Sequence, residues 1–191
     1  MPKTKAKTFD PDEFLLDLYA MSKKKVNSLL LREIKKAKPN LEKIEVMIKS
    51  GLADVEAKDE VGWTPLHSAA LNNAIETAKL LIDAGADVKA KDDYGQTPLH
   101  HASRWNSIET AKLLLERGAD VGAKNIWGQT PLHLATRMNA IETAKLLLDA
   151  GADVDAKTDS GWTPLDTAYS YEMKDLFKKY KKRLAKKKNI V

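Results

Sequence analysis

The most constraining feature of this 191-residue chain is a four-residue motif that returns at a fixed interval. Threonine, proline, leucine and histidine occur in that order at residues 64–67, 97–100 and 130–133, so each copy begins 33 residues after the one before. A variant that ends in aspartate follows at residues 163–166. A fixed period of this length is typical of a repeat protein, in which each unit packs only against its neighbours.

Each copy of the motif predicts the start of a short helix. Threonine is a favoured N-cap because its hydroxyl can accept a bond from an unpaired N–H group, and proline is tolerated at the next position. Asparagine, which tolerates the left-handed conformation that ends a helix, follows as Asn73, Asn106 and Asn139. A second helix is predicted where Ile, Ala and Leu recur on one face, at residues 75–82, 108–115 and 141–148.

A glycine-containing segment completes the period. Gly-Ala-Asp-Val occurs at residues 85–88, 118–121 and 151–154, and a polar stretch then leads through Gly95 or Gly128 to the next motif, which predicts a turn or hairpin. The whole pattern resembles the ankyrin repeat. This resemblance implies an all-α solenoid (α-solenoid) of stacked helix-turn-helix units, with projecting hairpin-like loops and a curved surface that binds other proteins.

The resemblance and the flanking composition together predict the domain organisation. A basic, disordered start and one extra helix are expected at residues 1–25, since Asp10, Pro11 and Glu13 form a helix-start pattern ahead of apolar residues. We expect that helix to cover the first face of the solenoid, and a docking motif for another protein is the alternative. The ankyrin repeat domain is expected at residues 26–180, with an N-terminal cap at 26–60, full repeats at 61–93, 94–126 and 127–159, a C-terminal cap at 160–180, and a basic tail at 181–191.

Composition narrows the classes of function. The chain has no cysteine, which excludes disulfides, thiolate metal sites and cysteine nucleophiles and agrees with a reducing compartment. No apolar run approaches the roughly 18 residues of a membrane span, and the start lacks the apolar stretch of a signal peptide. We therefore expect a cytoplasmic monomer, with nuclear entry or export as an effector left open.

The repeats carry no pattern that predicts catalysis. The recurring histidines His67, His100 and His133 stand at equivalent places on neighbouring helices, about 8–10 Å apart, which is too far for a shared zinc ion. The resemblance implies a structural role in which they bond the backbone of neighbouring hairpins. No phosphate loop, nucleophile elbow or metal-ligand spacing is present, so we expect no enzyme activity, no cofactor and no metal.

The residues that vary between repeats are the candidate binding residues. Tryptophan, tyrosine and arginine are enriched at binding hot spots, and the resemblance places the hairpin tips and the ends of the first helices on the concave face. For Trp63 and Trp162, which follow the hairpin glycine, packing against a neighbour is an equally good reading. The predicted protein-binding residues are Val61, Trp63, Tyr94, Arg104, Trp105, Ile126, Trp127, Arg137, Met138 and Trp162.

The net charge of +5 belongs to the two ends of the chain. Residues 1–58 carry 13 basic and 9 acidic side chains, residues 59–160 carry 10 and 15, and residues 161–191 carry 9 and 3. The alternative function is therefore binding of nucleic acid or an anionic membrane surface through the basic ends. No aromatic residue interleaves with the lysines after Tyr180, so we expect a solvated tail and a protein partner, not nucleic acid or membrane.

Overall fold

A computed structural model describes residues 9–36 and 38–188, and the expected disorder of residues 1–8 lies outside this range. The described residues form ten α-helices, one short 3-10 helix and no β-strand, which confirms the predicted all-α solenoid. The helices are α1 (Pro11–Tyr19), α2 (Lys23–Ile34), α3 (Leu41–Lys49), α4 (Pro65–Leu71), α5 (Ile75–Asp83), α6 (Pro98–Arg104), α7 (Ile108–Glu116), α8 (Pro131–Arg137), α9 (Ile141–Asp149), η1 (Leu165–Thr167) and α10 (Tyr171–Lys188).

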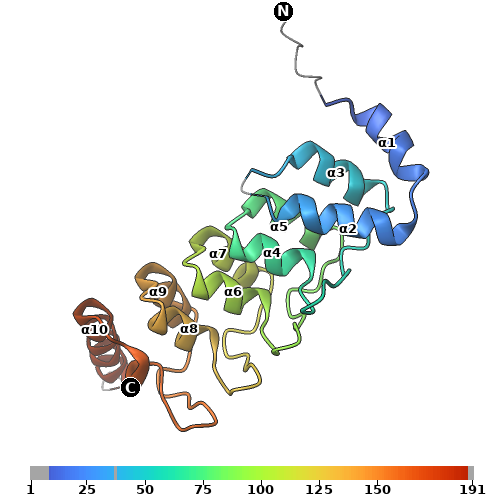
Figure 1. Cartoon of the computed structure of the whole chain (residues 1–191). Coiled ribbons are helices and arrows are strands. Elements are labelled where there is room, and N and C mark those ends of the chain that lie inside the picture. Colours follow the sequence, from blue (N-terminus) through green and yellow to red (C-terminus); the bar gives the residue numbers. More distant parts are fainter. Residues whose placement is uncertain (1–8, 37, 189–191) are drawn as a thin grey trace, which may run out of the picture.

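The helices stack in sequence order as two layers (Figure 1). The first helices of successive repeats, α2, α4, α6 and α8, pack against one another, and η1 follows α8 in the same layer. The second helices α3, α5, α7, α9 and α10 form the other layer. In Figure 1 the loops between repeats project to one side of the stack, and α1 and α10 lie at its opposite ends.

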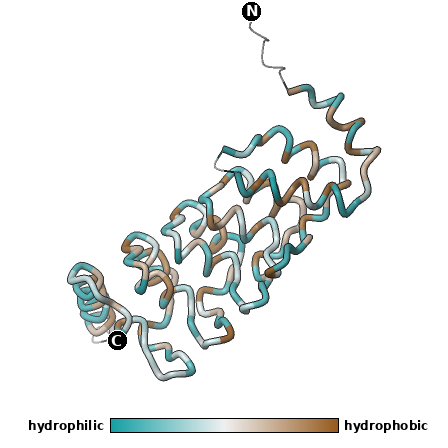
Figure 2. Tube along the Cα trace, viewed as in Figure 1, coloured by the Kyte–Doolittle hydropathy of each residue, from teal (hydrophilic) through white to brown (hydrophobic). Residues whose placement is uncertain are grey.

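Apolar residues of both layers form one continuous core. Leu66, Leu99 and Leu132 of the first helices are fully buried. The second helices contribute an equally buried leucine per repeat, and Figure 2 shows hydrophobic residues recurring in each helix pair while hydrophilic residues predominate along α10. The helix ends also follow the prediction, because Asn73, Asn106 and Asn139 adopt positive φ angles of 51°, 54° and 57°.

The repeated histidines join each repeat to the next. His67 Nε2 lies 3.0 Å from the carbonyl oxygen of Gln96, and because a carbonyl only accepts, Nε2 carries the proton. The other ring nitrogen, Nδ1, then accepts from the backbone N–H and the hydroxyl of Thr64, at 3.1 and 2.8 Å. The Thr64 hydroxyl thus donates to the ring, and it also accepts from the backbone N–H of His67 in a capping box, which confirms the predicted N-cap. The same bridge joins His100 to Gln129 (3.1 Å) and His133 to Trp162 (3.0 Å).

Two further side chains cross each boundary between repeats. Lys58 Nζ donates to the carbonyl oxygen of Lys91, one period later, at 3.0 Å. The Asn73 amide donates to the Glu109 carboxylate at 2.9 Å and accepts the N–H of Thr110 at 3.1 Å. Each repeat therefore bonds the next through both a loop and a second helix. The bonds recur from Lys91 to Lys124, from Lys124 to Lys157, and from Asn106 to Glu142 and Thr143.

At the N-terminal end, α1 packs against α3. The Asp10 carboxylate accepts the N–H groups of Asp12 and Glu13 at 2.9 and 3.2 Å, which is the predicted cap of this helix. Leu18 of α1 is fully buried, so the helix covers part of the end of the stack. In contrast, Leu16 of the same helix is 72% exposed. The next helix, α2, begins at Lys23, three residues before the predicted start of the repeat domain at residue 26.

At the C-terminal end, the repeat pattern changes. Asp166 stands in place of histidine and its carboxylate accepts the Thr163 N–H at 2.7 Å, while the first helix shortens to the single turn of η1. Phe177 of α10 is fully buried, and the Tyr180 hydroxyl donates to the Leu148 carbonyl oxygen at 2.5 Å. These contacts hold α10 against α9.

The basic segment after Tyr180 continues the last helix. We expected a separate tail from Lys181, but α10 runs to Lys188. Two of its cations bond the preceding repeat: Lys181 Nζ lies 2.7 Å from an Asp155 carboxylate oxygen, and Arg183 lies 2.6 Å from Asp149. This part of the segment therefore contacts the solenoid.

The stacking of first helices makes a prediction about stability. Leu99→Ala removes buried methyl groups between repeats and should lower the free energy of unfolding by about 2–5 kcal/mol, because a cavity remains. Leu16→Ala is the matched control, and it should change stability by less than about 0.5 kcal/mol because Leu16 is exposed. Denaturant unfolding followed by circular dichroism measures both. Equal effects of the two changes would contradict the stacking role of Leu99.

The histidine bridges predict unfolding in acid. Burial lowers the pKa of His67 and of His100 from 6.5 to about 4. Between these pH values the folded state binds fewer protons than the unfolded chain, so acidification favours unfolding. We expect these residues to contribute full stability above pH 6.5 and to lose it as the pH falls towards 4, by about 1.4 kcal/mol per pH unit for each histidine.

Denaturant unfolding at several pH values between 6.5 and 4 measures this slope. His100→Gln is the informative variant, since it removes one of the titrating histidines whatever it does to stability at neutral pH. The slope of this variant should be shallower than that of the original chain. An identical slope would show that His100 does not titrate with folding.

Candidate functional site

A polar side chain at the base of each loop fixes the conformation of the loop. Asp92 Oδ1 accepts the N–H groups of Tyr94 and Gln96, at 2.9 and 2.8 Å. Asn125 Oδ1 does the same for Trp127 and Gln129, both at 3.0 Å, and Asp59 does so in the preceding loop. The bonded N–H groups belong to the loop residues themselves. The backbone that carries the aromatic side chains is therefore held in one conformation.

Neighbouring loops also bond to one another. Gly62 and Gly128 have positive φ angles of 77° and 71°, and a Cβ atom at either would lie 2.8 Å from the backbone nitrogen of the following loop. Only glycine allows this approach. An N–H group of each loop donates to a carbonyl oxygen of the loop before it, from Asp93 to Val61 (3.3 Å), from Ile126 to Tyr94 (3.1 Å) and from Asp159 to Trp127 (3.2 Å).

A groove of about 650 Å³ lies between these loops and the first-helix layer. It extends over the second and third full repeats and the C-terminal cap, and its size is that of a typical ligand-binding site. The loops contribute Tyr94, Gln96, Trp127, Gln129, Thr158, Ser160 and Trp162 to its lining, and the first-helix layer contributes Arg104, Leu134, Arg137 and Thr167.

Aromatic rings form the apolar part of this groove. Tyr94 and Trp127 stack with ring centroids 5.8 Å apart and an interplanar angle of 16°. Tyr94, Trp127 and Trp162 are 43%, 48% and 55% exposed, although each side chain is large and mainly apolar. Grouped exposed apolar residues of this kind mark interaction sites on soluble proteins.

Two arginines form the charged part of the groove. Arg104 and Arg137 occupy equivalent positions at the ends of α6 and α8, and neither makes an ion pair with any residue that the structure describes. Arg104 Nε is buried, and no group of the described chain accepts its hydrogen. In contrast, Arg117 and Arg183 are paired with Asp83 and Asp149, at 2.7 and 2.6 Å.

The structure brings together five of the ten predicted binding residues. Tyr94, Arg104, Trp127, Arg137 and Trp162 all line the groove. Whether they bind a partner stays a prediction. The other five lie outside the groove lining, and these are Val61, Trp63, Trp105, Ile126 and Met138.

The residues outside the groove differ in their surroundings. Trp63 is half-buried, and the edge of its ring meets the His101 ring with centroids 4.5 Å apart, so packing explains it. Trp105 is 55% exposed at the end of α6, yet it does not line the groove that its neighbour Arg104 lines. Val61, Ile126 and Met138 are also exposed, at 39%, 56% and 43%.

Sequence reasoning missed six lining residues, although the repeat offered a signal for several of them. Leu134 and Thr167 are equivalent to Ser68 and His101, so this position varies between repeats as strongly as the predicted ones do. A search of the variable positions for tryptophan and arginine passes over such smaller side chains. The missed residues are Gln96, Gln129, Leu134, Thr158, Ser160 and Thr167.

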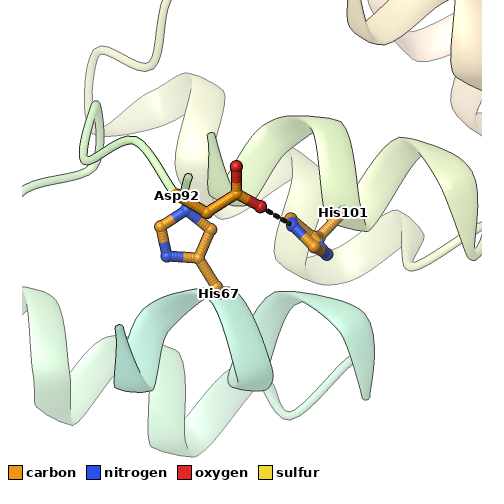
Figure 3. Close-up of side chains that lie close together, drawn as sticks. All are labelled: His67, Asp92 and His101. Atoms are coloured by element: carbon orange, nitrogen blue, oxygen red, sulfur yellow. Dashed lines mark hydrogen bonds and ion pairs between the residues drawn. The ribbon is translucent and has the colours of Figure 1, made fainter. Parts of the chain in front are cut away.

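His67, Asp92 and His101 form a buried cluster between α4 and α6 (Figure 3). His101 has close partners in this cluster, and its Nε2 lies 3.1 Å from Asp92 Oδ2. Burial by itself would raise the pKa of Asp92, but the bonds from His101 and the Gln96 N–H lower it overall. Both nitrogens of His67 are already bonded, to Thr64 and Gln96, so the cluster suits structural bonding better than metal binding.

The basic C-terminal helix offers fewer free cations than its sequence suggests. Lys179 pairs with Asp175 at 2.7 Å, in addition to the ion pairs of Lys181 and Arg183 with the preceding repeat. Among the described residues, no helix combines the length and apolar character needed to cross a bilayer. The basic residues of the chain start lie outside the described range.

Comparison with known proteins identifies the repeat. Protein phosphatase 1 regulatory subunit 27 of Homo sapiens and its Mus musculus counterpart are each 44% identical to this chain over 46 residues. That segment is 24% of this chain and 29% of each relative, so the match spans less than a third of their length. Two family models, both described as ankyrin repeats, match residues 32–125 and 114–168. These matches cover most of the stack described above, and the chain belongs to the ankyrin repeat family.

Proposed function

We propose that this protein is a non-catalytic adaptor that binds a partner protein in the groove between its loops and first helices. Ankyrin repeats in general form protein-interaction modules, and the proposal assigns the binding to one face of this one. The observation that carries it is the exposure of Tyr94, Trp127 and Trp162 beside the unpaired Arg104 and Arg137. These are the residue types that dominate the energy of protein interfaces.

The loop geometry supports the same proposal. Loops that bond to their own bases and to one another lose little conformational freedom when a partner binds, so less of the binding energy is spent on ordering them. The aromatic side chains therefore have the arrangement needed for binding before the partner arrives. Stacking of Tyr94 on Trp127 adds to this order.

The comparisons and the composition support the rest of the assignment. The curated relatives are named regulatory subunits, and a subunit of that kind acts together with another protein. A monomeric state and a cytoplasmic location are part of this proposal, and the absence of cysteine is consistent with a reducing compartment. The basic ends are the weaker candidate, because Lys179, Lys181 and Arg183 are engaged in ion pairs.

The combined change Trp127→Ala and Trp162→Ala tests the groove. We expect it to weaken a partner by about 2 kcal/mol or more, as loss of hot spots does, and to change folding stability by less than about 1 kcal/mol. A photoreactive amino acid at position 162 would cross-link the partner in cells, and titration calorimetry with the purified pair would give the affinity.

Trp105→Ala is the matched control, since this tryptophan is as exposed as Trp162 but lies outside the groove. It should leave partner affinity nearly unchanged. The proposal is wrong if Trp105→Ala abolishes binding while the groove variant, still folded, binds as the original chain does.

A further inference from the structure

The two arginines of the groove are not required by the fold. Arg104 and Arg137 occupy a position that holds Leu71 in the first full repeat and Ser170 in the C-terminal cap. A position that accepts leucine, arginine and serine places little demand on its side chain. Arginine stands there in the two full repeats that line the groove and not in the first full repeat, which contributes no lining residue, and this points to a role for the groove itself.

The Arg104 guanidinium also lacks a partner for one buried donor. Its Nε is shielded from solvent, and no described residue accepts its hydrogen. A buried polar group left in this state costs about 1–3 kcal/mol, and more when it is charged. Because Nε is shielded, a ligand in the groove would meet the rest of the guanidinium, which makes no ion pair with a described residue, so the site favours a ligand with an anionic acceptor.

The charge around the groove sharpens this preference. Among the described residues that line it there is no aspartate or glutamate, and the charged groups of this lining are the two guanidinium groups. The repeat region as a whole is acidic, with 15 acidic and 10 basic side chains at residues 59–160. The groove is therefore a small positive site on an acidic body, which suits a ligand carrying few negative charges.

We propose that the groove binds an extended acidic segment of the partner protein, with one carboxylate at each arginine and apolar side chains on the tryptophans. This inference rests on the proposed function. Equivalent residues of neighbouring first helices lie about 8–10 Å apart, while alternate residues of an extended peptide lie about 7 Å apart. The length and flexibility of the arginine side chains cover the difference, and guanidinium groups bind carboxylates through paired hydrogen bonds.

The observations favour this occupant over a nucleic acid strand. Aromatic and arginine side chains also bind single-stranded nucleic acid, but such sites lie in grooves of extended positive charge that follow the phosphate backbone. Here the charge is confined to Arg104 and Arg137, and the acidic body would repel the remaining phosphates. A segment with two carboxylates avoids that repulsion.

Selection from a phage-displayed library of random linear peptides tests the inference. The full chain is compared with Arg104→Gln/Arg137→Gln, with Arg104→Glu/Arg137→Glu and with Trp127→Ala/Trp162→Ala. Peptides selected by the original chain should be rich in aspartate and glutamate next to apolar residues. Their affinity for the glutamine variant should fall about tenfold or more, as expected when a charge pair is broken.

The charge-reversed variant guards against loss of binding through misfolding. It should select peptides rich in lysine and arginine, which is a gain that an unfolded protein would not give. Thermal unfolding of each variant checks the fold, and a single-stranded oligonucleotide and a phosphopeptide serve as competing probes for the groove.

The outcomes separate the two proposals. Groove-dependent peptides that lack acidic residues and bind the glutamine variant equally well overturn the acidic inference and leave the proposed function standing. Binding of the oligonucleotide or only of the phosphopeptide, lost in the glutamine variant, also overturns it. If no selected peptide is sensitive to Trp127→Ala/Trp162→Ala, the proposed function itself fails.

Discussion

The hydrogen bond from a buried histidine to the loop of the next repeat is the contact on which the rest of this structure depends. His67 holds its own helix start through Nδ1 and the Gln96 carbonyl through Nε2, so one ring fixes a helix and a loop at once. The ring must be neutral to do both, because Nδ1 acts as an acceptor. Burial of the ring favours this neutral form, and helix stacking supplies the burial.

These hydrogen bonds determine the shape of the groove. Its floor is the first-helix layer, whose spacing is set by stacking, and its wall is the row of loops, which the histidines attach to that layer. The loops therefore move with the helices. A surface formed in this way combines residues from neighbouring repeats, and Arg104 and Trp127 come to line one groove although different repeats supply them.

The repeat made most of the fold predictable, because identical motifs must adopt identical local structures. Asn73 and its equivalents, the buried leucines and the cap at Asp10 all follow from local chemistry. The two ends of the solenoid were harder to predict from the sequence. Lys181 and Arg183 of α10 form ion pairs with Asp155 and Asp149 of the preceding repeat, and a helix pattern read by itself contains no sign of these contacts.

The site was predictable only in part, because the type of a residue shows that its side chain is suited to binding but not which way the side chain faces. Trp63 and Trp162 occupy equivalent positions, yet Trp63 contacts the His101 ring and is half-buried, while Trp162 has no such neighbour among the described residues and is exposed.

The lysine and histidine bridges have one more consequence. Each repeat has hydrogen-bond donors at one boundary and matching acceptors at the other. Duplication or loss of a whole 33-residue unit would therefore leave no donor unmatched. The length of the groove can thus change in evolution while the core stays the same.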